Sequence, residues 1–166
     1  MQENQHLGPD SDKFRISVAG PDLKFREFWI TDPVPTGRQI IEAAGFGPPD
    51  AFVVLQWFPD KDLDEVELDE TTDVRPEGAG RFIVAKSTQW FEFVIDERRH
   101  PWPEKLITRE VLILLAGPDP AKFSVWQELR HWPSDKEIVD GHPADLAEPG
   151  LERFYTVLTH TTEGEL

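Results

Sequence analysis

The chain has 166 residues, no cysteine and a formal net charge of −15, which comes from 32 acidic and 17 basic residues. Without cysteine it cannot form disulfides, thiolate metal sites or a cysteine nucleophile. A negative field of this size opposes binding to nucleic acid and to anionic membranes, and it favours encounter with a basic protein surface.

The sequence carries no signal for membrane insertion or secretion. No apolar run approaches the roughly 20 residues that a membrane helix needs. The start, Met1-Gln2-Glu3-Asn4-Gln5, lacks the charged and apolar regions of a signal peptide. We therefore expect a cytoplasmic protein. Its acidity also serves solubility, so the charge alone does not establish a basic partner.

The first regular structure is predicted from Lys13 onward. Residues 1–12 have no hydrophobic period, and we interpret them as a flexible N-terminus. Apolar residues alternate over 14–18 and again over 23–30, on either side of Gly20-Pro21-Asp22. This pattern predicts a β-hairpin.

A short amphipathic helix is predicted next. Thr36-Gly37-Arg38-Gln39 has the form of a capping box, in which the Thr and Gln side chains bond to free backbone amides. An apolar stripe follows over 40–44, and Gly45 can end the helix in a left-handed conformation. Pro48 and Pro49 then prevent continuation.

Three further segments complete this first unit. Residues 52–58 read as a buried strand, and 81–86 as a final strand. The acidic stretch 60–73 between them suits a loop with a short edge strand. Its carboxylates lack the spacing and glycine of a calcium loop, so we favour a solvated loop over a metal site.

The second half of the chain repeats this order at an offset of 72 residues. Residues 78–85 match 150–157, with Gly, Arg and Phe in identical places, and Thr36 and Gly45 recur as Thr108 and Gly117. The second unit is expected to contain strands at 90–95, within 96–103, at 123–131 and at 153–159, a helix over 108–116 and an acidic loop at 134–148.

We therefore predict an α+β protein with two tandem domains, at residues 13–86 and 88–159, followed by a flexible tail at 160–166. In each domain a hairpin, one helix and a final strand beside the first would form a ubiquitin-like β-grasp fold. The linker at 87–89 is too short for wide independent motion.

Several motifs resemble the bacterial multi-ubiquitin family of ubiquitin-like repeats. The first unit is a diverged copy, with Thr36-Gly37 at the helix start and Asp73-Val74 before the last strand. The clearest motifs lie in the second unit: Ile107-Thr108, Leu115-Ala116-Gly117 and Asp145-Leu146-Ala147-Glu148-Pro149-Gly150-Leu151-Glu152-Arg153-Phe154-Tyr155.

The resemblance implies a protein modifier joined to target proteins through a C-terminal glycine. Its implied partners are an E1-like activating enzyme, an E2-like conjugating enzyme and a JAB-type metalloprotease, and its implied pathway is anti-phage defence. We assign conjugation to Gly164, after processing at Glu165 removes the last two residues.

Enzyme docking is assigned to Thr156, Leu158 and His160 from their place on and after the last strand. Two alternatives remain open for this end of the chain. Gly164 can be an incidental glycine of a loose terminus, and the protein can be an adaptor whose domains bind partners without covalent attachment.

No catalytic site or cofactor is predicted. The five histidines show no metal-ligand spacing, and we expect each at the surface; phosphate-binding glycine motifs are absent. The tryptophans lie in or beside expected strands, where core packing is the default interpretation. With no combination of nucleophile, base and orienting group, we expect the protein not to be an enzyme.

One difference between the two helices indicates a covered surface. Val111 and Leu114 stand where the first helix has polar Gln39 and Glu42. The pair can widen the core stripe of the second domain, contact the first domain, or form a partner patch.

Overall fold

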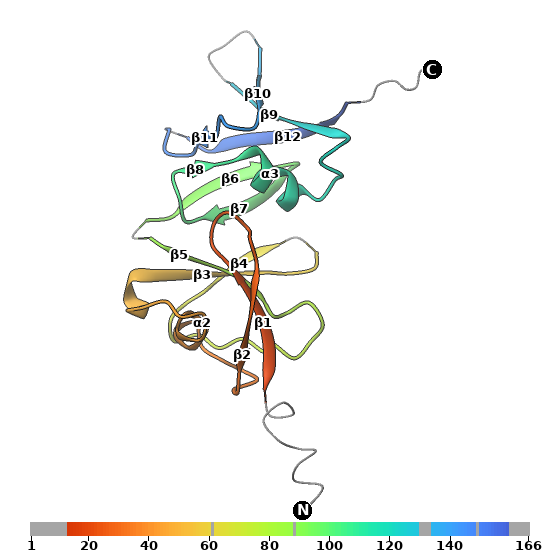
Figure 1. The fold of residues 1–166 in the computed structure, drawn as a ribbon. Helices are drawn as coiled ribbons and strands as arrows, with labels where there is room; N and C mark the ends of the chain where they lie inside the picture. The colour runs from red at the N-terminus through yellow and green to blue at the C-terminus, as the bar shows by residue number, and fades with distance from the viewer. Residues whose placement is uncertain (1–12, 61, 88, 130–133, 149, 160–166) are drawn as a thin grey trace, which may run out of the picture. The chain divides into compact units, whose positions relative to one another are not determined.

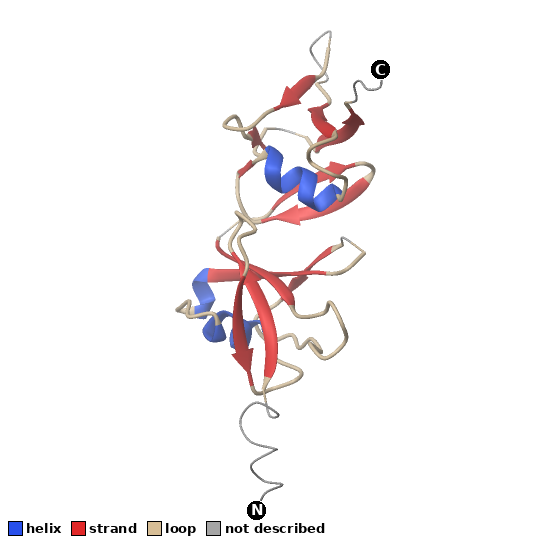
Figure 2. Cartoon of the chain, turned by 45° about the vertical axis from the view of Figure 1, so that its right-hand side comes forward, coloured by secondary structure: helices blue, strands red, loops and turns tan. Residues whose placement is uncertain are grey.

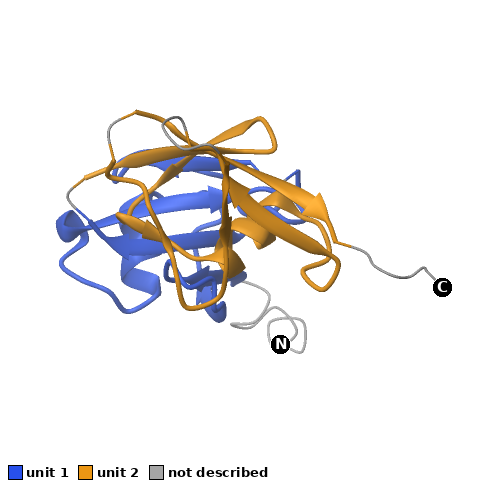
Figure 3. Ribbon diagram, turned by 90° about the horizontal axis from the view of Figure 1, so that it is seen from above, with its two compact units in different colours: residues 1–88 blue, residues 89–166 orange. Residues whose placement is uncertain are grey.

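The computed structural model of the chain describes residues 13–60, 62–87, 89–129, 134–148 and 150–159. The chain divides into two compact units, Met1–Thr88 and Gln89–Leu166, which we call domain 1 and domain 2 (Figure 3). Both are α+β domains with the ubiquitin-like β-grasp arrangement, which confirms the predicted fold class.

Domain 1 is a five-stranded sheet with one α-helix across a face (Figure 1). The sheet order is β2-β1-β5-β3-β4, so the last strand lies in the centre. It runs parallel to β1 and antiparallel to β3. The elements are β1 Phe14–Ala19, β2 Arg26–Ile30, α2 Gly37–Ala43, the 3-10 helix η2 Pro49–Ala51, β3 Phe52–Trp57, β4 Leu63–Val66 and β5 Arg81–Lys86.

The core of domain 1 lies between α2 and this sheet. Ile40 and Ile41 of the helix are fully buried in one cluster with alternate residues of the two central strands. Those strand residues include Ile16 and Val18 of β1, which lies beside the central strand, and Phe82 and Val84 of β5, the central strand itself. Because side chains alternate along a strand, Arg15, Ser17 and Arg81 point to the opposite face.

The second strand starts later than predicted, at Arg26 instead of residue 23. Leu23 has a φ of 59° and its amide donates to the Gly20 carbonyl at 3.0 Å, so it belongs to the turn. The Asp22 carboxylate accepts from the Lys24 amide at 3.0 Å and extends that turn. These local bonds compete with pairing and shorten the strand.

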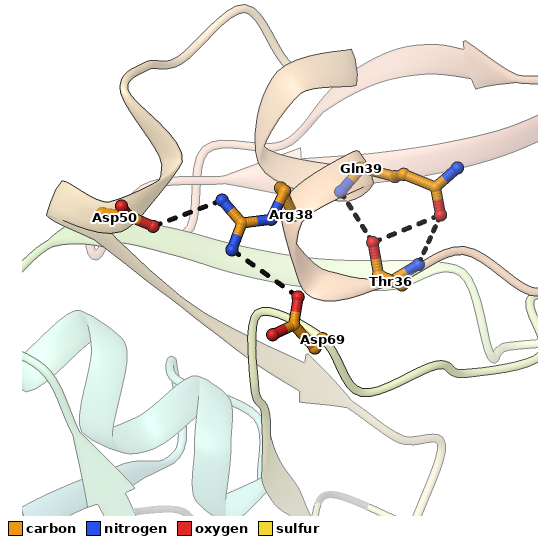
Figure 4. Close-up of polar contacts among 5 residues, drawn as sticks. All are labelled: Thr36, Arg38, Gln39, Asp50 and Asp69. Atoms are coloured by element: carbon orange, nitrogen blue, oxygen red, sulfur yellow. Dashed lines mark hydrogen bonds and ion pairs between the residues drawn. The ribbon is translucent and has the colours of Figure 1, made fainter.

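The predicted capping box at the start of α2 is confirmed (Figure 4). The backbone amide of Gln39 donates to Thr36 Oγ1 at 3.1 Å, and the backbone amide of Thr36 donates to Gln39 Oε1 at 2.8 Å. Arg38 on the same turn pairs with Asp50 at 3.2 Å and with Asp69 at 3.5 Å. The helix start is thus held by its own residues, by η2 and by the loop that carries Asp69.

Domain 2 repeats the five-stranded sheet in the order β10-β9-β12-β6-β7 and adds a two-stranded ladder, β8-β11 (Figure 2). Its last strand is again central. The elements are β6 Phe91–Ile95, β7 Arg98–Trp102, β8 Leu106–Ile107, α3 Arg109–Ala116, β9 Phe123–Gln127, β10 Lys136–Ile138, β11 Ala144–Asp145 and β12 Glu152–Leu158.

Contacts as well as sequence recur at the offset of 72. Asp73 accepts from the Arg75 amide at 2.9 Å, and Asp145 accepts from the Ala147 amide at 2.8 Å. The hydrophobic residue after each aspartate is buried. Its amide donates to a carbonyl before the helix, at Pro33 (3.0 Å) in domain 1 and at Lys105 (2.7 Å) in domain 2. The matching motifs therefore encode the same local turn.

The expectation that every histidine lies at the surface is wrong for His100. It is buried on β7, opposite Phe93 of β6, and the two ring centroids are 5.4 Å apart. The strand period places its side chain on the core face beside Phe93 and Trp102. His142 is exposed. The other three histidines, His6, His131 and His160, lie outside the described residues.

Gly37 allows a close approach that should make alanine harmful, although alanine favours helices by about 1 kcal/mol over glycine. A Cβ at residue 37 would lie 2.5 Å from the Glu67 carbonyl oxygen and 2.9 Å from that of Val66. We predict that Gly37→Ala lowers the free energy of unfolding by about 2 kcal/mol, as overpacking does, measured by urea denaturation.

Gly20→Ala is the matched control, because its nearest neighbour would be Asp22 Oδ1 at an ordinary 3.8 Å. It should change stability by less than about 0.5 kcal/mol. A Gly37→Ala protein as stable as the parent would show that the close approach does not constrain the first turn of α2.

Candidate functional site at the end of the last strand

The last strand of domain 2, β12, changes its neighbours halfway along its length. Residues 152–154 pair in parallel with 93–95 of β6, whereas residues 154–158 pair antiparallel with 123–127 of β9. After Phe154, β12 therefore has a strand partner on one side only. The other edge of its second half is open to further contacts.

A turn residue closes the first part of that edge. Asp96 begins the β6–β7 turn with a φ of 48°, and its amide donates to the Phe154 carbonyl at 3.1 Å. Its carboxylate accepts from the Thr156 amide at 2.9 Å and from Thr156 Oγ1 at 2.7 Å. The turn thus extends the support of β12 by two residues beyond the end of β6.

The residues after Thr156 stay paired with β9, but their side chains are exposed. Val157 is 41% exposed and Leu158 is 61% exposed, although they point to opposite faces. Thr159 ends the described strand region, with its amide donating to the Lys122 carbonyl at 2.8 Å. Two aliphatic side chains on consecutive positions are therefore available to a partner.

Two of the three predicted docking residues, Thr156 and Leu158, are described by the structure, and they differ in exposure. Leu158 is exposed, whereas Thr156 is partly buried and its side chain is used by Asp96. The sequence did not point to Val157, because strand alternation assigns only one face of β12 to solvent. It did not point to Asp96 either, because this turn residue lies 60 positions before Thr156 and no local pattern links the two. His160, Gly164 and Glu165 lie outside the described residues, so their assignments stay predictions.

The middle of β12 is held by side chains of the neighbouring strand and loop. Tyr155 pairs with Trp126 across the β12–β9 ladder, and its hydroxyl donates to Asp135 Oδ2 at 2.7 Å. That hydrogen bond raises the pKa of the Tyr155 phenol, and desolvation and the charges of Asp135 and Glu128 raise it further. The phenol therefore stays neutral to a higher pH than a free tyrosine does.

Val111 and Leu114 do not share one environment. Val111 is 2% exposed and lies among the buried residues of α3, whereas Leu114 is 38% exposed. Leu114 borders an open groove lined also by Glu110, Pro120 and Asp140. Only Leu114 is thus available as a surface contact.

The described residues contain neither a candidate metal centre nor a membrane-spanning helix. Among them, no group of three or more His, Asp or Glu side chains could hold a metal ion. No helix within the described ranges is long and apolar enough to cross a membrane. The geometry instead presents a firmly paired strand whose far end emerges beside exposed aliphatic side chains.

This fold, repeated twice, defines the chain as a tandem ubiquitin-like protein. The sequence model of the Multiubiquitin family matches residues 22–87 and 91–159, one segment in each domain. These segments cover most of the chain, which therefore belongs to the Multiubiquitin family. No curated protein matches the chain significantly.

The different burial of Val111 and Leu114 predicts different costs for the same substitution. Val111→Ser should lower the free energy of unfolding of domain 2 by about 2 to 3 kcal/mol, since it removes buried apolar surface and adds a buried hydroxyl. Leu114→Ser should cost less than about 1 kcal/mol. Urea denaturation measures both, and equal losses would contradict the assigned burial.

Tyr155 is the chain's single tyrosine, so tyrosinate absorbance reports on it alone. We predict a midpoint above the ordinary pKa of about 10, lowered by Asp135→Asn and unaffected by Asp140→Asn. Because the folded pKa is the higher one, the contribution to stability is complete below pH of about 10 and is lost as pH rises through the folded pKa. A parent midpoint equal to that of Asp135→Asn would disprove the hydrogen bond.

Proposed function

We propose that this Multiubiquitin-family protein is a ubiquitin-like modifier that partner enzymes attach to target proteins through Gly164. The observation that carries the proposal is the form of β12. It is held by Asp96 at Thr156 and by β9 as far as Leu158, and the exposed Val157 and Leu158 side chains lie just before a tail with one glycine. A rigid domain with an extended end suits enzymes that read the domain and act on the tail.

The proposed chemistry takes place in the partners. A JAB-type metalloprotease hydrolyses the Gly164–Glu165 peptide bond with water and frees the glycine carboxylate. An E1-like enzyme adenylates that carboxylate with ATP, with release of pyrophosphate, and then transfers the acyl group to a thiol as a thioester, with release of AMP. An E2-like enzyme then delivers the acyl group to a target amine. This protein contributes the acyl group and the docking surface.

A glycine at the acyl position has a physical advantage. Without a side chain it can pass through a narrow channel and take up conformations that other residues avoid. The four residues 160–163 span about 13 Å when extended at about 3.3 Å each. Such a tail would let an enzyme hold Leu158 while its reactive site reaches Gly164.

The family resemblance also supports a role in anti-phage defence in the bacterial cytoplasm. An adaptor that binds its partners without covalent attachment is the competing function. It requires neither Gly164 nor processing, so removal of residues 160–166 separates the two functions.

The first test follows the mass of the full-length chain during incubation with its cognate metalloprotease. We expect the loss of one Glu and one Leu residue, followed by an adduct with the activating enzyme. Gly164→Ala should prevent adduct formation, because the methyl group obstructs the channel. Normal adducts of Gly164→Ala, or equal activation of the untrimmed chain, would refute this assignment and favour the adaptor.

The docking role of Leu158 is tested with the same enzymes. Leu158→Ser should raise the KM of the activating enzyme for the trimmed protein about tenfold, since it removes one exposed aliphatic contact. Leu106→Ser is the matched control, because Leu106 is also an exposed leucine at the surface of domain 2. Equal effects of the two changes would exclude a specific contact at β12.

A further inference from the structure

An open hollow on the helix-free face of domain 1 has a basic lining, in a chain whose net charge is −15. It lies where β1 and β5 run in parallel, with Ser17 opposite Arg81 in the register. Its lining residues are Arg15, Ser17, Pro59, Gly78, Gly80 and Arg81. Two cations thus face one space with no acidic residue in its lining.

Arg81 is held in place by aromatic rings. Its guanidinium carbon lies 4.0 Å from the ring centroid of Trp57 and 5.8 Å from that of Phe25. No described carboxylate forms an ion pair with it within 4.0 Å. Burial lowers the pKa of Arg81, since desolvation penalises its charge. A stacked, partly desolvated guanidinium of this kind gains from an anion at its edge.

Arg15 can supply the second cation. It pairs with Glu27 at 3.4 Å, and both side chains are about 60% exposed. An exposed pair of this kind contributes about 0 to 1 kcal/mol. Arg15 can therefore exchange Glu27 for another carboxylate at little cost.

Two glycines keep the floor of the hollow free of side chains. Gly78 has a φ of 82°, and a Cβ there would overlap Pro59 Cγ. At Gly80 a Cβ would lie 3.1 Å from the Arg15 carbonyl oxygen. Larger residues would fill the space beside the arginines or displace the loop.

In domain 2 the arginine that corresponds to Arg81, Arg153, lines a mainly acidic hollow. Register places Val94 opposite Arg153, as Ser17 is opposite Arg81. Three carboxylates, of Asp96, Glu97 and Glu128, line that hollow together with Arg153. The corresponding arginines of the two repeats therefore line hollows of different charge, and Arg153 serves as an internal control.

We propose that the hollow of domain 1 binds the carboxylate of a Glu or Asp side chain on a partner protein, between Arg15 and Arg81. The planar guanidinium of Arg81 suits the two oxygens of a carboxylate. The strongly negative chain repels a phosphate dianion more than a carboxylate monoanion, which favours the latter. This site is independent of Gly164 and of conjugation.

The test is an NMR titration of the full-length chain that follows the arginine Nε–Hε signals. The probes are acetate and N-acetylglutamate amide, with sodium chloride at matched ionic strength as the reference. We expect a saturable shift of the Arg81 signal and of the Gly78 and Gly80 amides, while the Arg153 signal stays unchanged. Shifts that chloride reproduces, or equal shifts at Arg153, would overturn the site.

Substitutions test whether Arg15 and Arg81 each contribute to carboxylate binding. Arg15→Gln should weaken acetate binding about tenfold, whereas Arg153→Gln should leave it unchanged. Arg81→Lys keeps the charge without the planar fork, and it should weaken binding to a similar extent while the protein stays folded. Full binding by either Arg15→Gln or Arg81→Lys would overturn the assignment. Inorganic phosphate that binds more tightly than acetate would overturn the carboxylate specificity.

Discussion

Parallel pairing between the first and the last strand of each domain is the constraint on which the rest of this structure depends. A parallel pair cannot be joined by a tight turn, so the chain must cross the sheet between them. The helix and the other three strands of the five-stranded sheet are formed by the chain between them. Because the last strand is then central, it must be apolar on the helix side, and Phe82 and Phe154 occupy the same position in the two domains. Each domain therefore ends on the central strand of its sheet.

The tandem repeat shows which contacts the fold needs and which it leaves free. Helix caps at Thr36 and Thr108, and turns at Asp73 and Asp145, recur with nearly the same distances. These contacts fix the chain where it enters the helix and the last strand. The helix-free face carries no such requirement, and there the hollows differ in charge. A duplicated domain can thus provide two recognition surfaces on one framework.

The proposed function depends both on a stable sheet and on residues beyond it. Asp96 and Lys122 hold the end of β12 from its two sides, through Thr156 and Thr159. Between these two contacts Val157 and Leu158 stay paired with β9 while their side chains are exposed. An enzyme that contacts this end meets a defined aliphatic surface, and any tail chemistry begins from a fixed position. The family membership and this geometry support the same role through different observations.

Local interactions explain what the sequence by itself determined. The order of strands and helices, the capping box of α2 and the cap of α3 depend on residues within a few positions of each other, so the sequence shows them directly. The repeat is likewise visible in the sequence, because the same motifs recur at a fixed offset. Tertiary structure alone decided the burial of His100, the exposure of Val157 and Leu158, and the stacking of Arg81 on Trp57. The contact between Asp96 and Thr156 joins residues 60 positions apart. Such contacts depend on strand register, and register is set by the packing of the whole domain and not by any one segment.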